Sequence, residues 1–304
     1  MMIWSIVYQV WLKGIGMKYV LLSFVAVMGL LGTVTADQFE VGGKALEIPA
    51  PKDFVLVTPE MEEVYHYSQL VDSADLLNEN VAYYISAAEA PAALQGELPE
   101  LKRTFILKAN RKLKDKVVGL VNFLELKKAT KREYRQIIQE IKAKDPKLYE
   151  RLNTGIQEQF DLATAIEVSQ LVPFEPHFES SHALAVSMFL TIYLPPEEGA
   201  AEEAEPVEEI SAATATVMNV EGKLLFLFCY APQDDLEWTR TASRDWTKAI
   251  IAANDKPPVA SSYPSNFDPL KPDQGDKIAK WILIGAALLV ALAIFVKKNR
   301  IKTD

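Results

Sequence analysis

The chain has 304 residues, of which 49% are hydrophobic, and its formal net charge is −9 at pH 7. This length suffices for one large domain or two small ones. The negative charge argues against generic nucleic-acid binding, because neutralising phosphates requires a basic surface. The single cysteine, Cys229, permits no internal disulfide. We therefore expect a domain that is stabilised by its hydrophobic core alone.

The N-terminal segment, residues 1–36, predicts a signal peptide. Lys18 supplies a short positive region, and residues 19–31 form an apolar stretch. Val34-Thr35-Ala36 then places small residues at positions −3 and −1 of a cleavage site, so we expect cleavage at the end of this segment. The pattern begins at Met17, which favours Met17 as the start of translation. An uncleaved N-terminal anchor is the alternative.

Residues 278–296 predict one transmembrane helix. Trp281 to Val296 is an unbroken apolar run, and the lysines that flank it can reach the membrane interfaces. The basic residues of 297–304 stay in the cytoplasm by the positive-inside rule. Residues 255–277 are polar and rich in proline, which predicts an extended stalk. We therefore expect a single-pass protein of a bacterial cytoplasmic membrane, with residues 37–254 outside as one domain.

Within the exported domain, strand and helix patterns alternate. Segments rich in β-branched or aromatic residues predict strands, and apolar residues that recur every three or four positions predict helices. The predicted strands are 45–57 with a turn at 49–53, 81–85, 104–108, 165–172, 183–194, 212–220 and 224–230; predicted helices cover 134–141 and 145–160 and begin again at Asp234. The sum predicts an α+β fold in which an antiparallel sheet packs against helices.

Three local features refine this fold. Residues 220–223 (Val-Glu-Gly-Lys) predict a tight hairpin. Leu224 to Tyr230 is apolar on both faces, which predicts a central strand and makes Cys229 a buried small hydrophobic residue. Asp234 and Glu237 stand three positions apart and predict a capping box at the start of the last helix.

Two stretches resemble the PsbP-like family of small α+β domains. Residues 48–57 contain a P-x-x-F initial strand, and residues 212–254 contain a strand that runs into a closing helix. The matching stretches cover about a third of the predicted domain. It implies a non-enzymatic role in binding or assembly at a membrane surface, and it assigns no functional residue.

Charge is distributed unevenly along the chain. Residues 101–151 contain 16 Lys or Arg and 6 Asp or Glu, a net charge of +10, so the remainder carries −19. The basic side chains include Lys112, Lys114, Lys116, Lys127, Lys128, Lys131 and Arg132. They predict either a surface for an acidic partner or anionic lipid, or the solvated face of two helices.

An acidic loop is predicted at residues 195–209. It contains seven glutamates and no basic residue: Glu197, Glu198, Glu202, Glu203, Glu205, Glu208 and Glu209. Such a loop can dock on the basic helices, bind a partner or collect divalent cations; the alternative is a solubilising insertion.

The candidate metal ligands in the sequence form one cluster, which consists of Glu175, His177, Glu179 and His182. In an extended chain the first three face one way, as metal ligands must. Their spacing matches no strong zinc motif, and Pro173 and Pro176 are typical of an ordinary connection between strands.

The chain contains no nucleophile elbow, HExxH, P-loop, GxGxxG or CxxC motif. His66 is predicted to be a partly buried helix residue rather than a catalytic base. We therefore predict a non-enzymatic envelope protein that binds a protein partner or supports assembly at the membrane surface, with no cofactor. A small-ligand or metal-binding domain is the alternative.

Overall fold

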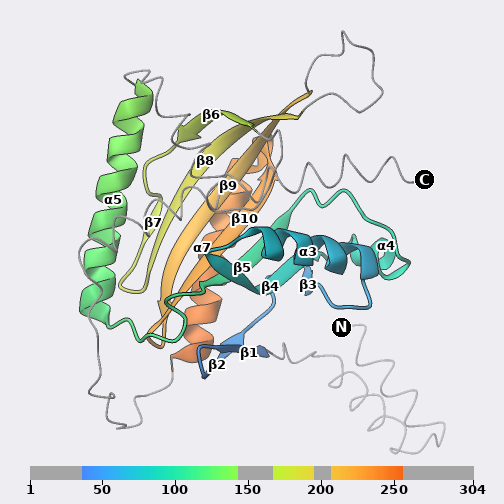
Figure 1. The fold of residues 1–304 in the computed structure, drawn as a ribbon, viewed down its shortest axis with the longest axis horizontal. Helices are drawn as coiled ribbons and strands as arrows, with labels where there is room; N and C mark the ends of the chain where they lie inside the picture. The colour runs from blue at the N-terminus through green and yellow to red at the C-terminus, as the bar shows by residue number, and fades with distance from the viewer. Residues whose placement is uncertain (1–35, 143–166, 195–206, 256–304) are drawn as a thin grey trace, which may run out of the picture. The chain divides into compact units, whose positions relative to one another are not determined.

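The computed structural model describes residues 36–142, 167–194 and 207–255 (Figure 1). The predicted signal peptide, the predicted helix at 145–160 and the predicted membrane helix lie outside these ranges, and so does the predicted stalk beyond its first residue. Among the helices that the structure describes, none is both long and apolar enough to cross a membrane.

The largest element of the described structure is one antiparallel sheet of eight strands, as the sequence predicts. The strand order is β3-β4-β5-β10-β9-β8-β6, and the short β7 also pairs with β8. The strands are β3 (Phe54–Leu56), β4 (Asn78–Ser86), β5 (Thr104–Asn110), β6 (Glu167–Pro173), β7 (Phe178–Glu179), β8 (Ala183–Leu194), β9 (Val207–Val220) and β10 (Lys223–Pro232). A separate ribbon joins β1 (Asp37–Val41) to β2 (Lys44–Ile48).

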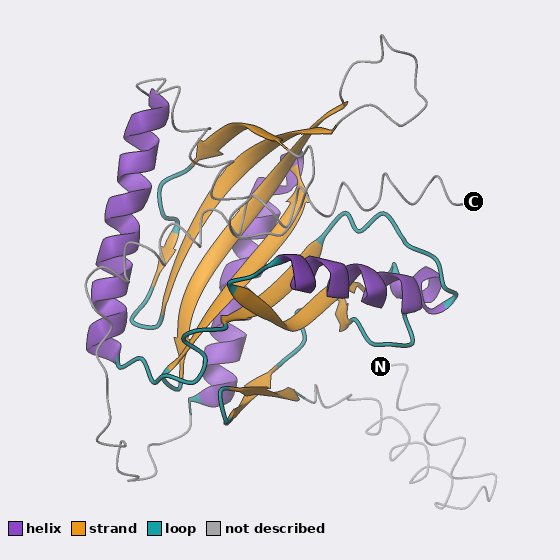
Figure 2. Ribbon diagram, viewed as in Figure 1, coloured by secondary structure: helices purple, strands orange, loops and turns teal. Residues whose placement is uncertain are grey.

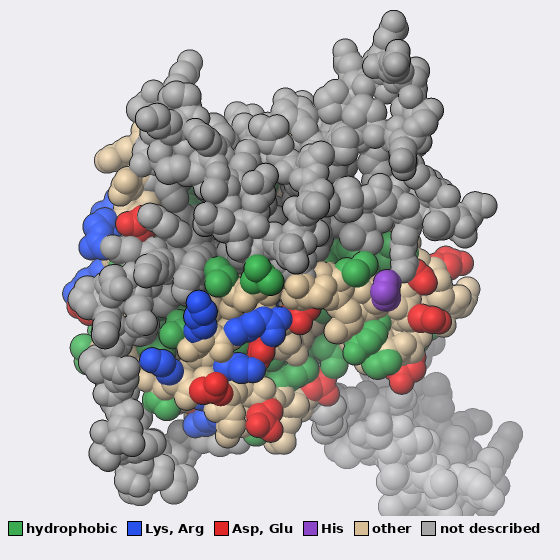
Figure 3. Space-filling model, viewed as in Figure 1, with side chains coloured by type: hydrophobic (Ala, Val, Ile, Leu, Met, Phe, Trp, Pro, Cys, Tyr) green, Lys and Arg blue, Asp and Glu red, His purple; other side chains and the backbone are tan. Residues whose placement is uncertain are grey.

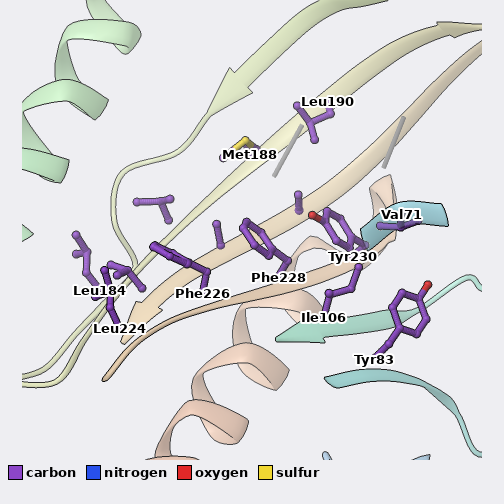
Figure 4. Close-up of a cluster of buried hydrophobic side chains, with 14 of the residues drawn as sticks. Val71, Tyr83, Ile106, Leu184, Met188, Leu190, Leu224, Phe226, Phe228 and Tyr230 are labelled. Carbon is purple, nitrogen blue, oxygen red and sulfur yellow. The ribbon is translucent and has the colours of Figure 1, made fainter. Parts of the chain in front are cut away.

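Strand β10 lies at the centre of this sheet, between β5 and β9. Its residues from Lys223 to Ala231 are all buried, because both faces of the strand contact a hydrophobic core. Leu224, Phe226, Phe228 and Tyr230 belong to one core (Figure 4), and Leu225, Leu227 and Cys229 belong to the other. The predictions of a central strand and of a buried Cys229 are confirmed.

Helices cover both faces of the sheet (Figure 2). Helix α7 (Leu236–Asn254) packs on one face through Trp246 and Ile250, and β1 and β2 lie beside it. Helices α3 (Glu62–Ala74), α4 (Ala90–Leu94) and α5 (Leu120–Lys142) contribute to the core on the other face. The fold is therefore α+β, with helices packed on both faces of the sheet.

The predicted hairpin between β9 and β10 is confirmed. Glu221 and Gly222 have φ angles of 48° and 81°, the left-handed values that a type I′ two-residue turn requires at both central positions. A side chain at Gly222 would meet Val117 Cγ1 at 2.8 Å, so glycine is needed here for space as well as for conformation.

This hairpin lies at one end of the domain, which we call the hairpin end, and other segments are fastened to it. Lys223 Nζ donates to the carbonyl oxygens of Gly42 (2.9 Å) and Lys114 (2.8 Å). The Val118 N–H donates to the Gly222 oxygen at 2.7 Å. One lysine therefore joins the β1–β2 turn to the loop that leads into α5.

The predicted capping box at the start of α7 is wrong. A 3₁₀ turn (Gln233–Asp235) precedes the helix, and Asp235 is the N-cap without a side-chain cap bond. The Asp235 carboxylate instead accepts two hydrogen bonds from Arg103, both 2.9 Å long. Glu237 pairs with Arg240 at 2.6 Å. Because Asp234 lies inside the 3₁₀ turn and Asp235 takes the N-cap position, Glu237 is the second helical residue rather than the third. The predicted pair is therefore one residue out of register with a capping box.

Two further predictions need correction. His66 lies on α3, as predicted, but its side chain is exposed rather than partly buried. Residues 207–209, at the end of the predicted acidic loop, belong to β9 and pair with the end of β8. The rest of that loop, residues 195–206, lies outside the described residues.

Candidate functional site

Glu179, one of the four residues predicted to bind a metal, is held by lysines of α5. Its carboxylate accepts hydrogen bonds from Lys131 Nζ at 2.9 and 3.1 Å, and Lys127 Nζ lies 3.3 Å away. These hydrogen bonds, first of all the one from Lys131, lower the pKa of Glu179. The carboxylate therefore attaches the β6–β8 connection to α5.

The other three residues point elsewhere. Glu175 is exposed. His182 Nδ1 lies 2.8 Å from Ser181 Oγ, and His177 contacts β8. Within residues 36–142, 167–194 and 207–255, no three His, Cys, Asp or Glu side chains are placed to hold a metal ion. The four predicted ligands therefore do not assemble into a metal site in this structure.

His177 instead ends a chain of buried hydroxyl groups between the sheet and α7. His177 Nδ1 lies 3.2 Å from Ser187 Oγ on β8, which lies 2.8 Å from Thr214 Oγ1 on β9. Thr214 Oγ1 lies 2.8 Å from Thr239 Oγ1 on α7. Thr239 in turn donates to the carbonyl oxygen of Leu236 at 2.8 Å. This chain of hydrogen bonds connects four segments of the fold.

The donor and acceptor in each of these hydrogen bonds follow from the last one, between Thr239 and the Leu236 carbonyl oxygen. A carbonyl oxygen only accepts and a hydroxyl has one proton, so Thr239 gives its proton to Leu236. Thr214 then donates to Thr239, and Ser187 donates to Thr214. Ser187 Oγ can only accept from His177, which requires the proton on Nδ1. His177 is therefore no base toward Ser187, since the hydroxyl proton of Ser187 points away from the imidazole.

The remaining nitrogen, His177 Nε2, is then an acceptor. It is buried, and no atom in the part of the chain that the structure describes bonds to it. Burial, followed by the positive charge of Arg240, lowers the pKa of His177 to about 4. Arg240 reaches Ser187 Oγ at 3.4 Å and lies over the ring of Phe174 at 4.9 Å. The imidazole is thus neutral at neutral pH, with one unpaired lone pair.

This assignment predicts the ¹⁵N spectrum of His177. We expect a protonated Nδ1 and an unprotonated Nε2 at pH 7, and no second protonation until the pH approaches 4. The folded pKa lies below the value of about 6.5 in unfolded chains, so the stability from this group is complete above pH ~6.5 and decreases as the pH falls toward 4. A protonated Nε2 at pH 7 would contradict the assigned donors and acceptors of this hydrogen-bond chain.

A second cluster of ionisable groups lies on the opposite face of the sheet. Lys108 Nζ and Asp75 Oδ2 are 2.9 Å apart, and both side chains are 0% exposed. The Asp75 carboxylate also accepts from the N–H groups of Leu77 (3.1 Å) and Asn78 (3.0 Å). Burial alone would raise the pKa of Asp75, but Lys108 and these hydrogen bonds outweigh it and lower that pKa. The pair fixes the end of α3 to β5.

The outward face of α5 carries the basic side chains that the sequence predicts as a surface. Its exposed residues include Val121, Leu124, Lys128, Arg132 and Arg135, which we call the α5 stripe. They recur every three or four positions, so they share one side of the helix. Glu125, which pairs with Lys128 at 2.7 Å, is the acidic residue on this side within the described part of α5.

The inward face of α5 is fixed to the sheet by polar contacts as well as by its core side chains. Tyr134 Oη donates to the backbone carbonyl oxygen of Ser187 at 2.7 Å, and Lys127 Nζ donates to the backbone carbonyl oxygen of Ser180. Phe123 and Leu126 are buried in the core. The α5 stripe is therefore presented by an anchored helix.

No family model, no curated protein and no solved structure matches this chain. The function must therefore be inferred from the chemistry of the described residues.

Sequence reasoning missed the hydroxyl chain, although a signal for it exists. Thr214 and Thr216 alternate with alanine in a buried strand, and Thr239 and Ser243 stand four apart on α7. Both spacings place hydroxyl groups on one face, and Thr216 Oγ1 does lie 2.7 Å from Ser243 Oγ. Small polar residues at matching periods on two buried elements predict such a contact.

Proposed function

We propose that this chain is a membrane-tethered, non-enzymatic protein whose α+β domain binds a protein partner with an acidic surface. The observation that carries the proposal is the α5 stripe, where Lys128, Arg132 and Arg135 line the outward side of an anchored helix. Complementary charge gives such a surface both association rate and specificity. The predicted C-terminal anchor would hold the domain at the membrane where it meets its partner.

The ionisable groups of the domain support a binding role. Glu179 is engaged by α5, the buried Asp75–Lys108 pair is closed to solvent, and the proton of Ser187 points away from His177. Cys229 is fully buried, and burial raises the pKa of its thiol, which keeps it protonated and unreactive. These groups are accounted for by the fold, whereas the α5 stripe presents its basic side chains on the exposed outward side of the helix.

Affinity purification from membranes tests the proposal. We expect the full-length protein, gently solubilised, to retain a discrete partner that is lost from the variant Lys128→Glu/Arg132→Glu/Arg135→Glu. The matched control is Lys52→Glu/Lys102→Glu/Lys248→Glu, which changes the net charge equally at exposed positions elsewhere. Loss of the partner from both variants, or from neither, would refute a role for the α5 stripe.

A small ligand is the second candidate, and the buried Nε2 of His177 favours it. A ligand that donates a hydrogen bond, or a metal ion, would shift the Nε2 resonance of His177 in the same ¹⁵N spectrum. Titration with Zn²⁺ and with a mixture of small amides provides the probes. An unchanged resonance would remove this candidate and leave partner binding.

A further inference from the structure

The described chain leaves the domain at the hairpin end. Asn254, the last residue of α7, donates from Nδ2 to the Glu47 oxygen at 2.7 Å, and the Glu47 N–H donates to Asn254 Oδ1 at 2.9 Å. These bonds fix the end of α7 to β2, and Lys223 fastens the β1–β2 turn to the loop before α5. Figure 1 shows the end of α7, the β1–β2 ribbon and the start of α5 at this same end.

An exposed apolar cluster lies at the same end. Leu120, Val121 and Leu124, at the start of α5, are 50%, 73% and 43% exposed. Leu124 follows Val121 by three positions and Leu120 by four, so its side chain neighbours both of them on the helix surface. We call them the apolar corner. Core packing does not explain a valine that is 73% exposed, and a contiguous exposed apolar group marks a contact surface.

Basic side chains surround the apolar corner. Residues 111–135 contain nine Lys or Arg and three Asp or Glu. Lys112 and Lys116 are exposed in the loop that leads into α5, and Lys128 is exposed one turn after Leu124. Figure 3 shows Lys and Arg side chains gathered on the visible part of this surface, with some Asp and Glu among them. Apolar side chains flanked by lysines are typical of a surface that enters an anionic lipid interface.

The position of the tether favours lipid over protein as the occupant of this corner. The chain continues from Asp255 through the predicted stalk of residues 255–277 to the predicted anchor. A stalk of this length spans at most about 80 Å when fully extended. This length lets the hairpin end, where the stalk leaves the domain, reach the bilayer surface.

We infer that the apolar corner inserts among the headgroups of an anionic bilayer, with Lys112 and Lys116 contacting lipid phosphates. The inference rests on the membrane tether of the proposed function. It also orients the domain. Arg132 and Arg135 lie about 16–21 Å farther along the helix than Val121, which is beyond the screening length of about 8–10 Å in physiological salt. The proposed protein partner would therefore bind farther along α5 than the lipid contact.

Depth-dependent quenching of a fluorophore tests this contact. The full-length variant Val121→Cys is labelled in its native state with an NBD fluorophore, which does not reach the fully buried Cys229. The protein is reconstituted into vesicles of phosphatidylcholine with phosphatidylglycerol, or of phosphatidylcholine alone, each with and without brominated lipid. The control position is Gln139, which is also exposed on α5 but lies far from the apolar corner.

We expect brominated lipid to reduce the emission at position 121 by about half in anionic vesicles, as for a group buried in the headgroup region, and to leave position 139 unchanged. Neutral vesicles, or the substitutions Lys112→Gln/Lys116→Gln, should abolish the loss. Unquenched emission at position 121 in anionic vesicles overturns the inference. A blue shift at that position on adding the purified partner instead would assign the corner to protein.

Flotation of the same vesicles separates the two proposals. Protein that floats without quenching at position 121 keeps the tether and overturns the lipid contact. Protein that does not float refutes the tether, and the lipid contact with it.

Discussion

Replacing Lys108 by methionine, or Asp75 by asparagine, is expected to lower the free energy of unfolding by about 3–5 kcal/mol. Either change leaves one member of a fully buried ion pair without its opposite charge. Desolvation of an unpaired charge is costly because the interior screens it poorly. Urea denaturation of the full-length protein in detergent, followed by tryptophan fluorescence and circular dichroism, measures the loss.

The double variant Asp75→Asn/Lys108→Met is the control. Because it removes both charges, it should recover most of the stability lost by either single change. Losses that simply add in the double variant would show that the two charges do not interact, contrary to the 2.9 Å contact between them.

The same pair predicts a direction for acid sensitivity. The pKa of Asp75 is lowered in the fold, relative to about 3.9 in unfolded chains. Its contribution to stability is therefore complete above pH ~4 and is lost as the pH falls through the folded pKa. The Asp75→Asn variant should show less of this loss below pH ~4 than the unmodified protein.

The sheet could be predicted where the hydrophobic pattern was extreme. Leu224 to Tyr230 is apolar at every position, so only a strand buried on both faces accommodates it. The turn before it contains Gly222, and a two-residue turn with left-handed angles favours glycine. In contrast, β1 and β2 are short and partly exposed, and their pairing depends on contacts with the rest of the fold.

The predicted metal cluster shows why spacing alone does not define a site. Alternation in an extended chain would place His177 and Glu179 on one face. Strand β7 contains only Phe178 and Glu179, however, so the alternation does not extend to His177, which follows Pro176 outside the strand. His177 consequently contacts Ser187 on the side of α7, whereas Glu179 contacts Lys131 on α5.

The capping box failed for a different reason. Asp234 and Glu237 have the required spacing, but the helix begins one residue later than that spacing assumes, with Asp235 at the N-cap. Arg103, which is distant in sequence, forms a two-bonded pair with Asp235, and charge-assisted pairs of this geometry are strong. A contact between residues 132 positions apart is invisible to a local pattern.

Replacing Gly42 by alanine is expected to destabilise the domain by more than about 3 kcal/mol, in the range of changes that strain or displace backbone. An added Cβ would lie 1.8 Å from the Lys114 oxygen, so the two loops must separate. That movement also breaks the clamp in which Lys223 Nζ binds both the Gly42 and the Lys114 oxygens. Chemical denaturation of the full-length variant measures the loss.

The neighbouring residue Gly43 provides a matched control. Its φ angle is 74°, also left-handed, but an added Cβ would meet nothing within 4 Å. Gly43→Ala should therefore cost only the conformational penalty of about 1–2 kcal/mol. The difference between the two variants isolates the close approach of Gly42 to Lys114. Equal losses would mean that conformation alone makes glycine necessary at Gly42, and that the clamp at the hairpin end adjusts without cost.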